Sequence, residues 1–253
     1  VKQTHMFFGS EKQYASIRGI DISNILLKEI EKYKDKIEIM EDTTVLGIYE
    51  DGIITAENKG KYIKIRPKAV VVATGASEKA SAFPNNDLPG IYGAGAVQTL
   101  MNVYGVLPGK RALMVGAGNI GLIIAYQLMQ AGVDVAAVIH HSPRIGGYHV
   151  HASKIQRMGV PILTNHAIKE AKGKDNVESV VIHELDRDKN PIPGSEKKLD
   201  VDTICVSVGL SPLTELLAQA GCELEYVKEL SGLVPVIDDR YETSVKGIFV
   251  AGD

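Results

Sequence analysis

The sequence predicts an α/β fold built around a parallel sheet, and three observations carry this prediction. A strand, a glycine-rich turn, an apolar helix and a second strand follow one another over residues 111–139, which is a βαβ pattern. The continuous apolar runs Val70–Val72 and Ile204–Val208 are typical of strands that are buried on both faces. Short strand-like runs over residues 44–65, separated by glycine turns, predict a small antiparallel meander.

Composition narrows the class of protein. The chain has 253 residues, of which 45% are hydrophobic and 23% charged, enough for one large domain or two ordinary ones. A formal charge of -3 argues against nucleic acid as a partner. No apolar run reaches the roughly 18–20 residues that cross a bilayer, so no membrane partner is expected. Cys205 and Cys222 form no C-x-x-C pair, and two reduced thiols suit a cytoplasmic protein.

The remaining elements follow from apolar periodicity and from turn residues. A Pro-Gly pair within Leu107–Lys110 marks a boundary between two parts of the chain, and a helix is expected from the glycine-rich turn to about Gln130. The other expected helices cover residues 21–34, 94–104, 151–158 and 213–220, and the expected strands cover 37–40, 44–49, 53–56, 62–65, 70–72, 111–115, 133–139, 160–163, 177–185, 203–208, 233–237 and 247–251.

The motif that carries most of the functional argument is G-x-G-x-x-G, with the residues Gly116, Ala117, Gly118, Asn119, Ile120 and Gly121. It lies directly after an expected strand and directly before an apolar helix, which is the context that dinucleotide binding requires. The first glycine allows the tight turn, the second lets the backbone approach a pyrophosphate, and the third lets the helix pack on the strand. The N-terminus of the helix then offers free N–H groups to the phosphates. The competing interpretation is a plain glycine-rich turn.

The end of the second strand lacks the acidic residue that usually binds the ribose 2′-hydroxyl. His140, His141 and Arg144 lie there instead. Two interpretations stay open: these side chains accommodate a 2′-phosphate and favour NADP over NAD, or nucleotide affinity is weak or lost. A third possibility is that they are solvated loop side chains.

The other histidines and the cysteines predict no metal site. Histidines cluster over residues 140–166, but none of their pairs has the i, i+4 spacing of a zinc site with a carboxylate nearby. Cys205 lies on an apolar strand and is expected to pack in the core.

Four short segments together resemble the class II pyridine nucleotide-disulfide oxidoreductase superfamily. They are the Ala73-Thr-Gly75 turn, Leu88–Ala96 (LPGIYGAGA), the GAGNIG motif and the final Ala-Gly-Asp253. Within the superfamily, the chain is similar to the alpha-subunit-like flavoproteins of sarcosine oxidase, hydrogen cyanide synthase and opine or proline dehydrogenases. This resemblance implies a Rossmann-like NAD(P)-binding domain, with a parallel sheet and a β-meander, inserted in a partial FAD-binding domain. The implied domains are 1–107 (FAD-binding), 108–230 (NAD(P)-binding) and 231–253 (return to the FAD-binding domain).

The resemblance also assigns residues to cofactors. Thr74 and Gly75 match the turn at the end of a strand of the FAD domain, and Gly252 and Asp253 match the pair that holds the flavin's ribityl-pyrophosphate. Gly209 matches a motif near the nicotinamide. The family's first G-x-G-x-x-G, which grips the FAD pyrophosphate, would precede Val1. We therefore expect a piece of a longer protein that does not hold FAD tightly or act as an enzyme by itself, and whose exposed apolar surface favours homo-oligomers.

The function implied is the nucleotide-binding portion of an FAD- and NAD(P)-dependent oxidoreductase of the amine or amino-acid dehydrogenase alpha type. A small-molecule substrate and a beta-type flavoprotein subunit would be its partners. One alternative is an NAD(P)H-dependent reductase that passes electrons to a protein or quinone. Another is a non-catalytic nucleotide-binding or assembly module, which the missing acidic residue favours. No catalytic acid, base or nucleophile is identified.

Overall fold

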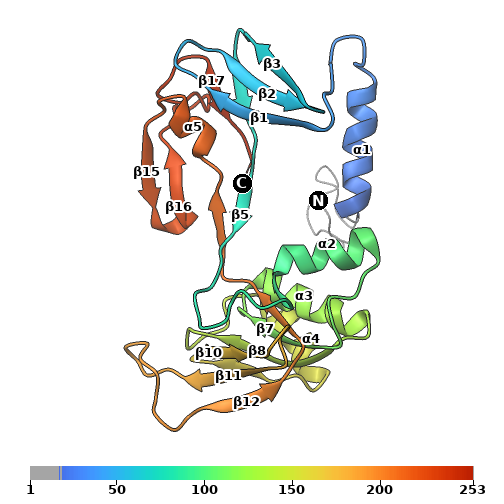
Figure 1. The fold of residues 1–253 in the computed structure, drawn as a ribbon, viewed down its shortest axis with the longest axis vertical. Helices are drawn as coiled ribbons and strands as arrows, with labels where there is room; N and C mark the ends of the chain where they lie inside the picture. The colour runs from blue at the N-terminus through green and yellow to red at the C-terminus, as the bar shows by residue number, and fades with distance from the viewer. Residues whose placement is uncertain (1–16, 18, 253) are drawn as a thin grey trace. The chain divides into compact units, whose positions relative to one another are not determined.

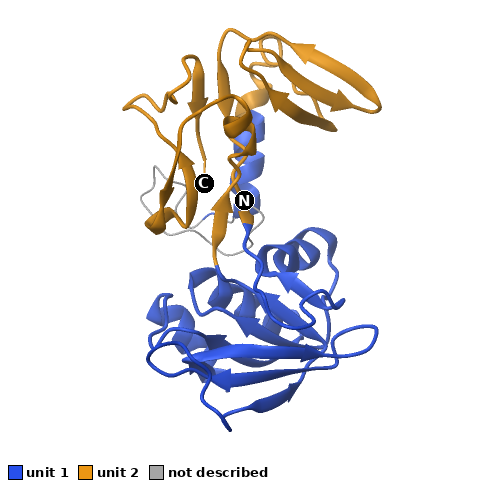
Figure 2. Ribbon diagram, turned by 60° about the vertical axis from the view of Figure 1, so that its left-hand side comes forward, with its two compact units in different colours: residues 1–28, 78–208 blue, residues 29–77, 209–253 orange. Residues whose placement is uncertain are grey.

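A computed structural model of the protein describes Ile17 and residues 19–252, which form two compact units (Figure 2). Unit 1 contains residues 78–208 together with the described residues up to Lys28, and unit 2 contains residues 29–77 and those from Gly209 onward. Among the described residues, no helix is long and apolar enough to span a membrane. The assignment of residues 1–107, 108–230 and 231–253 to particular cofactors stays a prediction, because compactness does not show what each unit binds.

A five-stranded parallel sheet forms the centre of unit 1. Its strands, in spatial order, are β6 (Ile91–Gly93), β13 (Thr203–Val206), β7 (Arg111–Val115), β8 (Asp134–His140) and β9 (Ile162–Thr164). Successive side chains of a strand point to opposite faces, so each strand supplies both sides of the core. On β7, Met114 packs with the helices and Leu113 packs with the meander, and both are fully buried.

The two faces of this sheet are covered differently (Figure 1). Helices cover one face: α2 (Ala94–Tyr104), α3 (Asn119–Gln130) and α4 (His149–Arg157). An antiparallel meander covers the other: β10 (His166–Lys172), β11 (Ser179–Glu184) and β12 (Lys197–Asp200). The predicted α/β class, a parallel sheet with helices on one side and a meander on the other, is confirmed.

Two glycines and one carboxylate set the ends of α2. The helix begins after Gly93, and Glu78 accepts hydrogen bonds from the N–H groups of Gly95 (2.7 Å) and Ala96 (3.3 Å) in its first turn. These bonds satisfy N–H groups that have no partner within the helix. Gly105, with a left-handed φ of 64°, ends the helix.

Unit 2 is built from small sheets around a compact apolar core. The core residues Ile48, Val72, Leu217 and Ile248 are almost fully buried. The elements are the antiparallel meander β1 (Thr43–Ile48), β2 (Ile54–Asn58) and β3 (Lys61–Ile65); the parallel pair β4 (Val70–Val72) and β17 (Ile248–Val250); β5 (Ala76–Glu78) beside β14 (Leu210–Pro212); the antiparallel pair β15 (Leu224–Val227) and β16 (Gly232–Pro235); the short helix α5 (Glu215–Gln219); and a 3-10 turn over Lys228–Leu230. The division at Lys28 falls within α1 (Gly19–Glu31).

Two expectations about secondary structure are wrong. The predicted strand over residues 37–40 is irregular chain that follows a turn at residues 32–36, and Ile39 is 62% exposed, because no neighbouring strand pairs with this run. The predicted strand over 203–208 ends at Val206, and Val208 is exposed. The strands β5, β6, β10, β12, β14 and β15 were not anticipated. All except β10 have only three or four residues, too few for the alternation of side chains to be recognised. β10 has seven residues, but its sequence HAIKEAK does not alternate regularly, and its pairing with β11 contains a bulge.

Candidate functional site

The three motif glycines lie between β7 and α3, and each has different surroundings. A Cβ on Gly116 would lie 2.0 Å from the carbonyl oxygen of Ser207, and Gly116 also has a positive φ of 108°. A Cβ on Gly121 would lie 2.1 Å from the carbonyl oxygen of Gly116. A Cβ on Gly118 would meet no atom within 4 Å. Close packing within the protein therefore explains the first and third glycines, but it does not explain the second.

The helix that follows starts at this open space. Gly118 is the N-cap of α3, and its carbonyl accepts the first helical bond, from the N–H of Leu122 (3.1 Å). The N–H groups of the first turn of a helix have no acceptor inside the helix. Those of α3 belong to Asn119, Ile120 and Gly121, and α3 carries no acidic residue in this turn. The arrangement is a positively polarised helix end beside an open glycine, which suits an anion.

His140 ends β8 beside the glycine-rich loop. Its Nδ1 atom accepts a hydrogen bond from the N–H of Ala117 at 3.4 Å, and its ring lies 4.8 Å from that of His141, centroid to centroid. Burial lowers the pKa of His140 below its usual value, and the nearby charges of His141 and Lys189 lower it further. The structure thus brings the predicted phosphate loop and the predicted ribose segment into contact. Arg144, four residues further on, is exposed.

A segment that the sequence reasoning missed also touches the glycine-rich loop. We call Ile145–Tyr148 the strap. The N–H groups of Gly146 and Gly147 both donate to the carbonyl oxygen of Ala117, at 3.1 and 2.9 Å, and the N–H of Tyr148 donates to Oδ1 of Asn119 at 2.7 Å. The signal available in the sequence was the Gly-Gly pair, which allows close approach of two backbones.

The predicted flavin-side residues lie together in unit 2. The turns after β4 and β17 are adjacent because the two strands are parallel neighbours, and the N–H of Ala251 donates to the carbonyl of Val72 at 3.0 Å. Thr74, Gly75 and Gly252 line one hollow of about 750 Å³, together with mostly apolar side chains. Asp253 lies outside the described residues.

Both glycines of this hollow have left-handed φ, 72° at Gly75 and 110° at Gly252, and a Cβ on either would meet open space. The hydroxyl of Thr74 donates to the carbonyl of Leu213 at 3.1 Å. Gly209 also lies in unit 2, where it is exposed with a φ of 118° and directly precedes β14.

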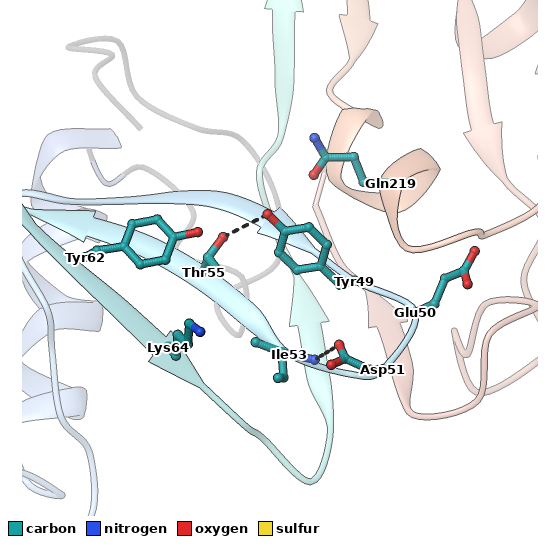
Figure 3. Close-up of a pocket in the computed structure, with 8 residues that line it drawn as sticks. All are labelled: Tyr49, Glu50, Asp51, Ile53, Thr55, Tyr62, Lys64 and Gln219. Atoms are coloured by element: carbon teal, nitrogen blue, oxygen red, sulfur yellow. Dashed lines mark hydrogen bonds between the residues drawn. The ribbon is translucent and has the colours of Figure 1, made fainter.

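Unit 2 has a second, shallower hollow of about 650 Å³ on its meander (Figure 3). The hydroxyl of Thr55 donates to that of Tyr49 at 3.4 Å, and Oδ1 of Asp51 accepts from the N–H of Ile53 at 3.1 Å. These hydrogen bonds lie within the β1–β2 hairpin and stabilise its conformation. None of the predicted site residues lines this hollow.

Both cysteines are buried, Cys205 in unit 1 and Cys222 in unit 2. Burial, and to a lesser extent the charge of Glu78, raises the pKa of the Cys205 thiol to about 12. The Sγ atom of Cys222 donates to the hydroxyl of Thr243 at 3.3 Å. The described residues contain no group of three or more His, Cys, Asp or Glu side chains placed to hold a metal ion.

Comparison with known proteins identifies the family of this chain. The family model described as pyridine nucleotide-disulphide oxidoreductase matches residues 2–253. This chain belongs to that family. The resemblance seen in the sequence is confirmed, and the family and its structural neighbours are FAD- and NAD(P)-dependent oxidoreductases.

Three curated relatives show the range of the family. An opine oxidase subunit of Agrobacterium tumefaciens (strain Ach5) is 27% identical over 206 residues, which are 77% of this chain and 40% of that protein. Sarcosine oxidase subunit alpha of Corynebacterium sp. (strain P-1) is 26% identical over 230 residues, 83% of this chain and 23% of that one. NADH oxidase of Methanocaldococcus jannaschii is 25% identical over 256 residues, 94% and 52% respectively. The chain thus spans about half or less of the length of these relatives.

The fold also matches solved structures. The crystal structure of T. acidophilum thioredoxin reductase superposes with a TM-score of 0.74 at 22% identity, covering 100% of this chain and 77% of that one. This likeness concerns the fold alone. The two cysteines of the present chain belong to different units, and both are free and buried.

Proposed function

We propose that this chain supplies the pyridine-nucleotide site and part of the flavin site of an FAD-dependent oxidoreductase that acts on an amine or amino acid. The observation that carries the proposal is the open space beside Gly118 at the N-terminus of α3. Two of the three motif glycines are required by the protein's own packing. The remaining glycine, Gly118, is left with room for a ligand.

The nucleotide fits this place in two respects. Its pyrophosphate is an anion, and the N–H groups in the first turn of α3 can donate hydrogen bonds to the phosphate oxygens without the help of a positively charged side chain. The absent side chain of Gly118 lets the phosphates approach the backbone. In this arrangement Gly116–Gly121 hold the pyrophosphate, and the protein contributes binding and orientation rather than bond chemistry.

The adenosine end of the nucleotide then lies toward the end of β8. There we assign the ribose to His140 and a 2′-phosphate to His141 and Arg144. Because no carboxylate ends β8, nothing in this segment repels the phosphate, and a guanidinium binds phosphate with two parallel hydrogen bonds. This favours NADP over NAD.

On the flavin side, we assign Thr74, Gly75 and Gly252 to the hollow of unit 2. The apolar lining and the two left-handed glycines form a concave surface with exposed backbone, which is typical of cofactor sites. When bound, FAD would supply the redox chemistry. Gly209 stays assigned to the surroundings of the nicotinamide.

The names of two relatives support the proposed substrate class. Two of them are named as subunits of oxidases for opines and for sarcosine, which are amino-acid derivatives. A further flavoprotein subunit of the beta type is the partner that this assignment implies. The second candidate, a reductase that passes electrons from NAD(P)H to another acceptor, is favoured by the NADH oxidase relative. A neighbouring coding region for a beta-type subunit would favour the first.

The experiment is a fluorescence titration of the chain with NADPH and NADH, with Gly118→Val as the test variant. Gly118 has ordinary extended φ and ψ of -76° and 177°, so valine fills the ligand's space without straining the backbone. We expect a loss of nucleotide affinity of at least about tenfold. Because valine is a poorer N-cap residue than glycine, we expect the free energy of unfolding to fall by about 1 kcal/mol, which leaves the protein folded at the temperature of the titration. Gln130→Val, at the exposed far end of α3, is the control and should bind as the unmodified chain does.

Either of two results would contradict the proposal. One is undiminished binding by Gly118→Val. The other is no binding of either nucleotide by the unmodified chain, which would support the non-catalytic module instead.

A further inference from the structure

The hairpin between β11 and β12 contains a turn that presents a lysine. Oδ1 of Asp186 accepts hydrogen bonds from the N–H groups of Asp188 (2.9 Å) and Asn190 (2.8 Å), and the N–H of Lys189 donates to the carbonyl of Asp186 (3.2 Å). Lys189 has a φ of 69°, a left-handed conformation that residues other than glycine rarely adopt. The carboxylate of Asp186 thus holds the backbone of Lys189 in one unusual geometry.

This turn is tied to the segment that follows β8. The N–H of Leu185 donates to the carbonyl of Asn165 (2.7 Å), and the N–H of Asn165 donates to the carbonyl of Ser142 (3.2 Å). Nζ of Lys189 donates to the carbonyl of His141 at 2.5 Å, although the two residues are 48 positions apart. A meander on one face of the sheet therefore reaches the loop at the end of β8.

The charge of Lys189 is available at that loop. Among the described residues, no carboxylate lies within 4 Å of its Nζ. Oδ1 of Asp186 is engaged by two backbone N–H groups of the same turn. A lysine ammonium has three donors, and the carbonyl of His141 uses one of them. Two donors and a full positive charge remain beside His141.

We propose that Lys189 is a specificity residue for the phosphorylated nucleotide, and that it binds the 2′-phosphate of the adenosine together with Arg144. The 2′-phosphate carries close to two negative charges and three acceptor oxygens, so it can accept from a guanidinium and an ammonium together. The inference rests on the nucleotide site proposed above. It adds a residue from the meander, which the glycine motif and its adjoining strand do not contain.

The test compares Lys189→Gln with the unmodified chain in titrations with NADPH, NADH and adenosine 2′-monophosphate. The last ligand probes the phosphate subsite without nicotinamide or flavin chemistry. We expect the dissociation constants of NADPH and of the monophosphate to rise by about tenfold and that of NADH to stay within about twofold. Lys189→Arg should keep most of the NADPH preference. Lys174→Gln, an exposed lysine in the β10–β11 turn of the same unit, is the charge-matched control and should change nothing.

The outcomes separate the two claims. If the unmodified chain prefers NADPH and Lys189→Gln keeps that preference, the role of Lys189 is overturned and the nucleotide site stands. If the unmodified chain binds NADH as tightly as NADPH, the 2′-phosphate assignment fails and the role of Lys189 fails with it. If it binds no nucleotide at all, the proposed site itself is overturned.

Discussion

The N–H of Ala117 donates a hydrogen bond to Nδ1 of His140 over 3.4 Å, which joins the glycine-rich loop to the end of β8. A ring nitrogen accepts a hydrogen bond only when it carries no proton, so this contact assigns the neutral form with the proton on Nε2. The Nε2–H group is then the donor that His140 can offer to a ribose hydroxyl. The position usually held by an acidic acceptor is thus occupied by a neutral donor.

His140 should titrate below the usual histidine value of about 6.5. Burial lowers its pKa most, followed by the charges of His141 and Lys189, so the folded state favours the neutral ring. The stability that this contributes is present above the unfolded pKa and is lost as the pH falls through the folded value. NMR titration of the imidazole signals would measure this. Lys189→Gln should raise the midpoint, and a midpoint at or above 6.5 in the unmodified protein would contradict the description of this site.

Gly147→Ala should destabilise the protein, whereas Gly146→Ala should not. A Cβ on Gly147 would lie 2.8 Å from Cδ1 of Leu122 and 2.9 Å from the backbone N of Asn119, and backbone in the first turn of a helix has little room to give. The nearest atoms to a Cβ on Gly146 are 3.9 Å away. We expect a loss of about 1–3 kcal/mol for the first and close to none for the second in urea unfolding. Equal effects would mean that the strap does not pack on α3 as described.

Asp202→Asn should cost stability at neutral pH, and the cost should shrink in acid. Burial by itself raises the pKa of Asp202, but the hydrogen bonds from the N–H groups of Arg111 and Lys110 outweigh it, so the pKa lies below the ordinary value. The stabilisation is therefore present above about pH 3.9 and is lost as the pH falls through the folded value. We expect about 1–3 kcal/mol at pH 7 from unfolding curves. A difference between the two proteins that does not depend on pH would show that the charge is irrelevant.

Neither thiol should react in the folded protein. With a pKa of about 12, Cys205 carries almost no thiolate at pH 8, and its side chain is fully buried. Using Cys222→Ser to isolate it, we expect reaction with a disulfide reagent to be roughly a thousandfold or more slower than that of a free thiol. The same variant in urea should react at once. Rapid stoichiometric labelling without denaturant would contradict the burial of Cys205 in the sheet.

Local patterns predicted the central elements well. The apolar run of β7 and the helix α2 have the predicted bounds, because an apolar strand and an amphipathic helix are visible within a few residues of sequence. The tasks of the glycines were also readable, since the need of Gly116 and Gly121 for close packing follows from the tight turn between strand and helix. Residues 37–40 show the limit of this approach. An apolar run becomes a strand only when another strand lies beside it.

The sequence by itself determined the α/β class, the family and the position of the nucleotide motif, because these depend on residues that are neighbours along the chain. Only the tertiary structure decided that Gly118 faces open space, that Gly147 packs on α3, and that Lys189 reaches His141. The last two contacts join segments that are far apart along the chain, and the open space at Gly118 depends on which segments do not reach it. No periodic pattern of residue types in the sequence records such long-range neighbours. The physical reason is that such contacts arise when the sheet places its strand ends and the meander beside one another, and sequence spacing does not record that placement.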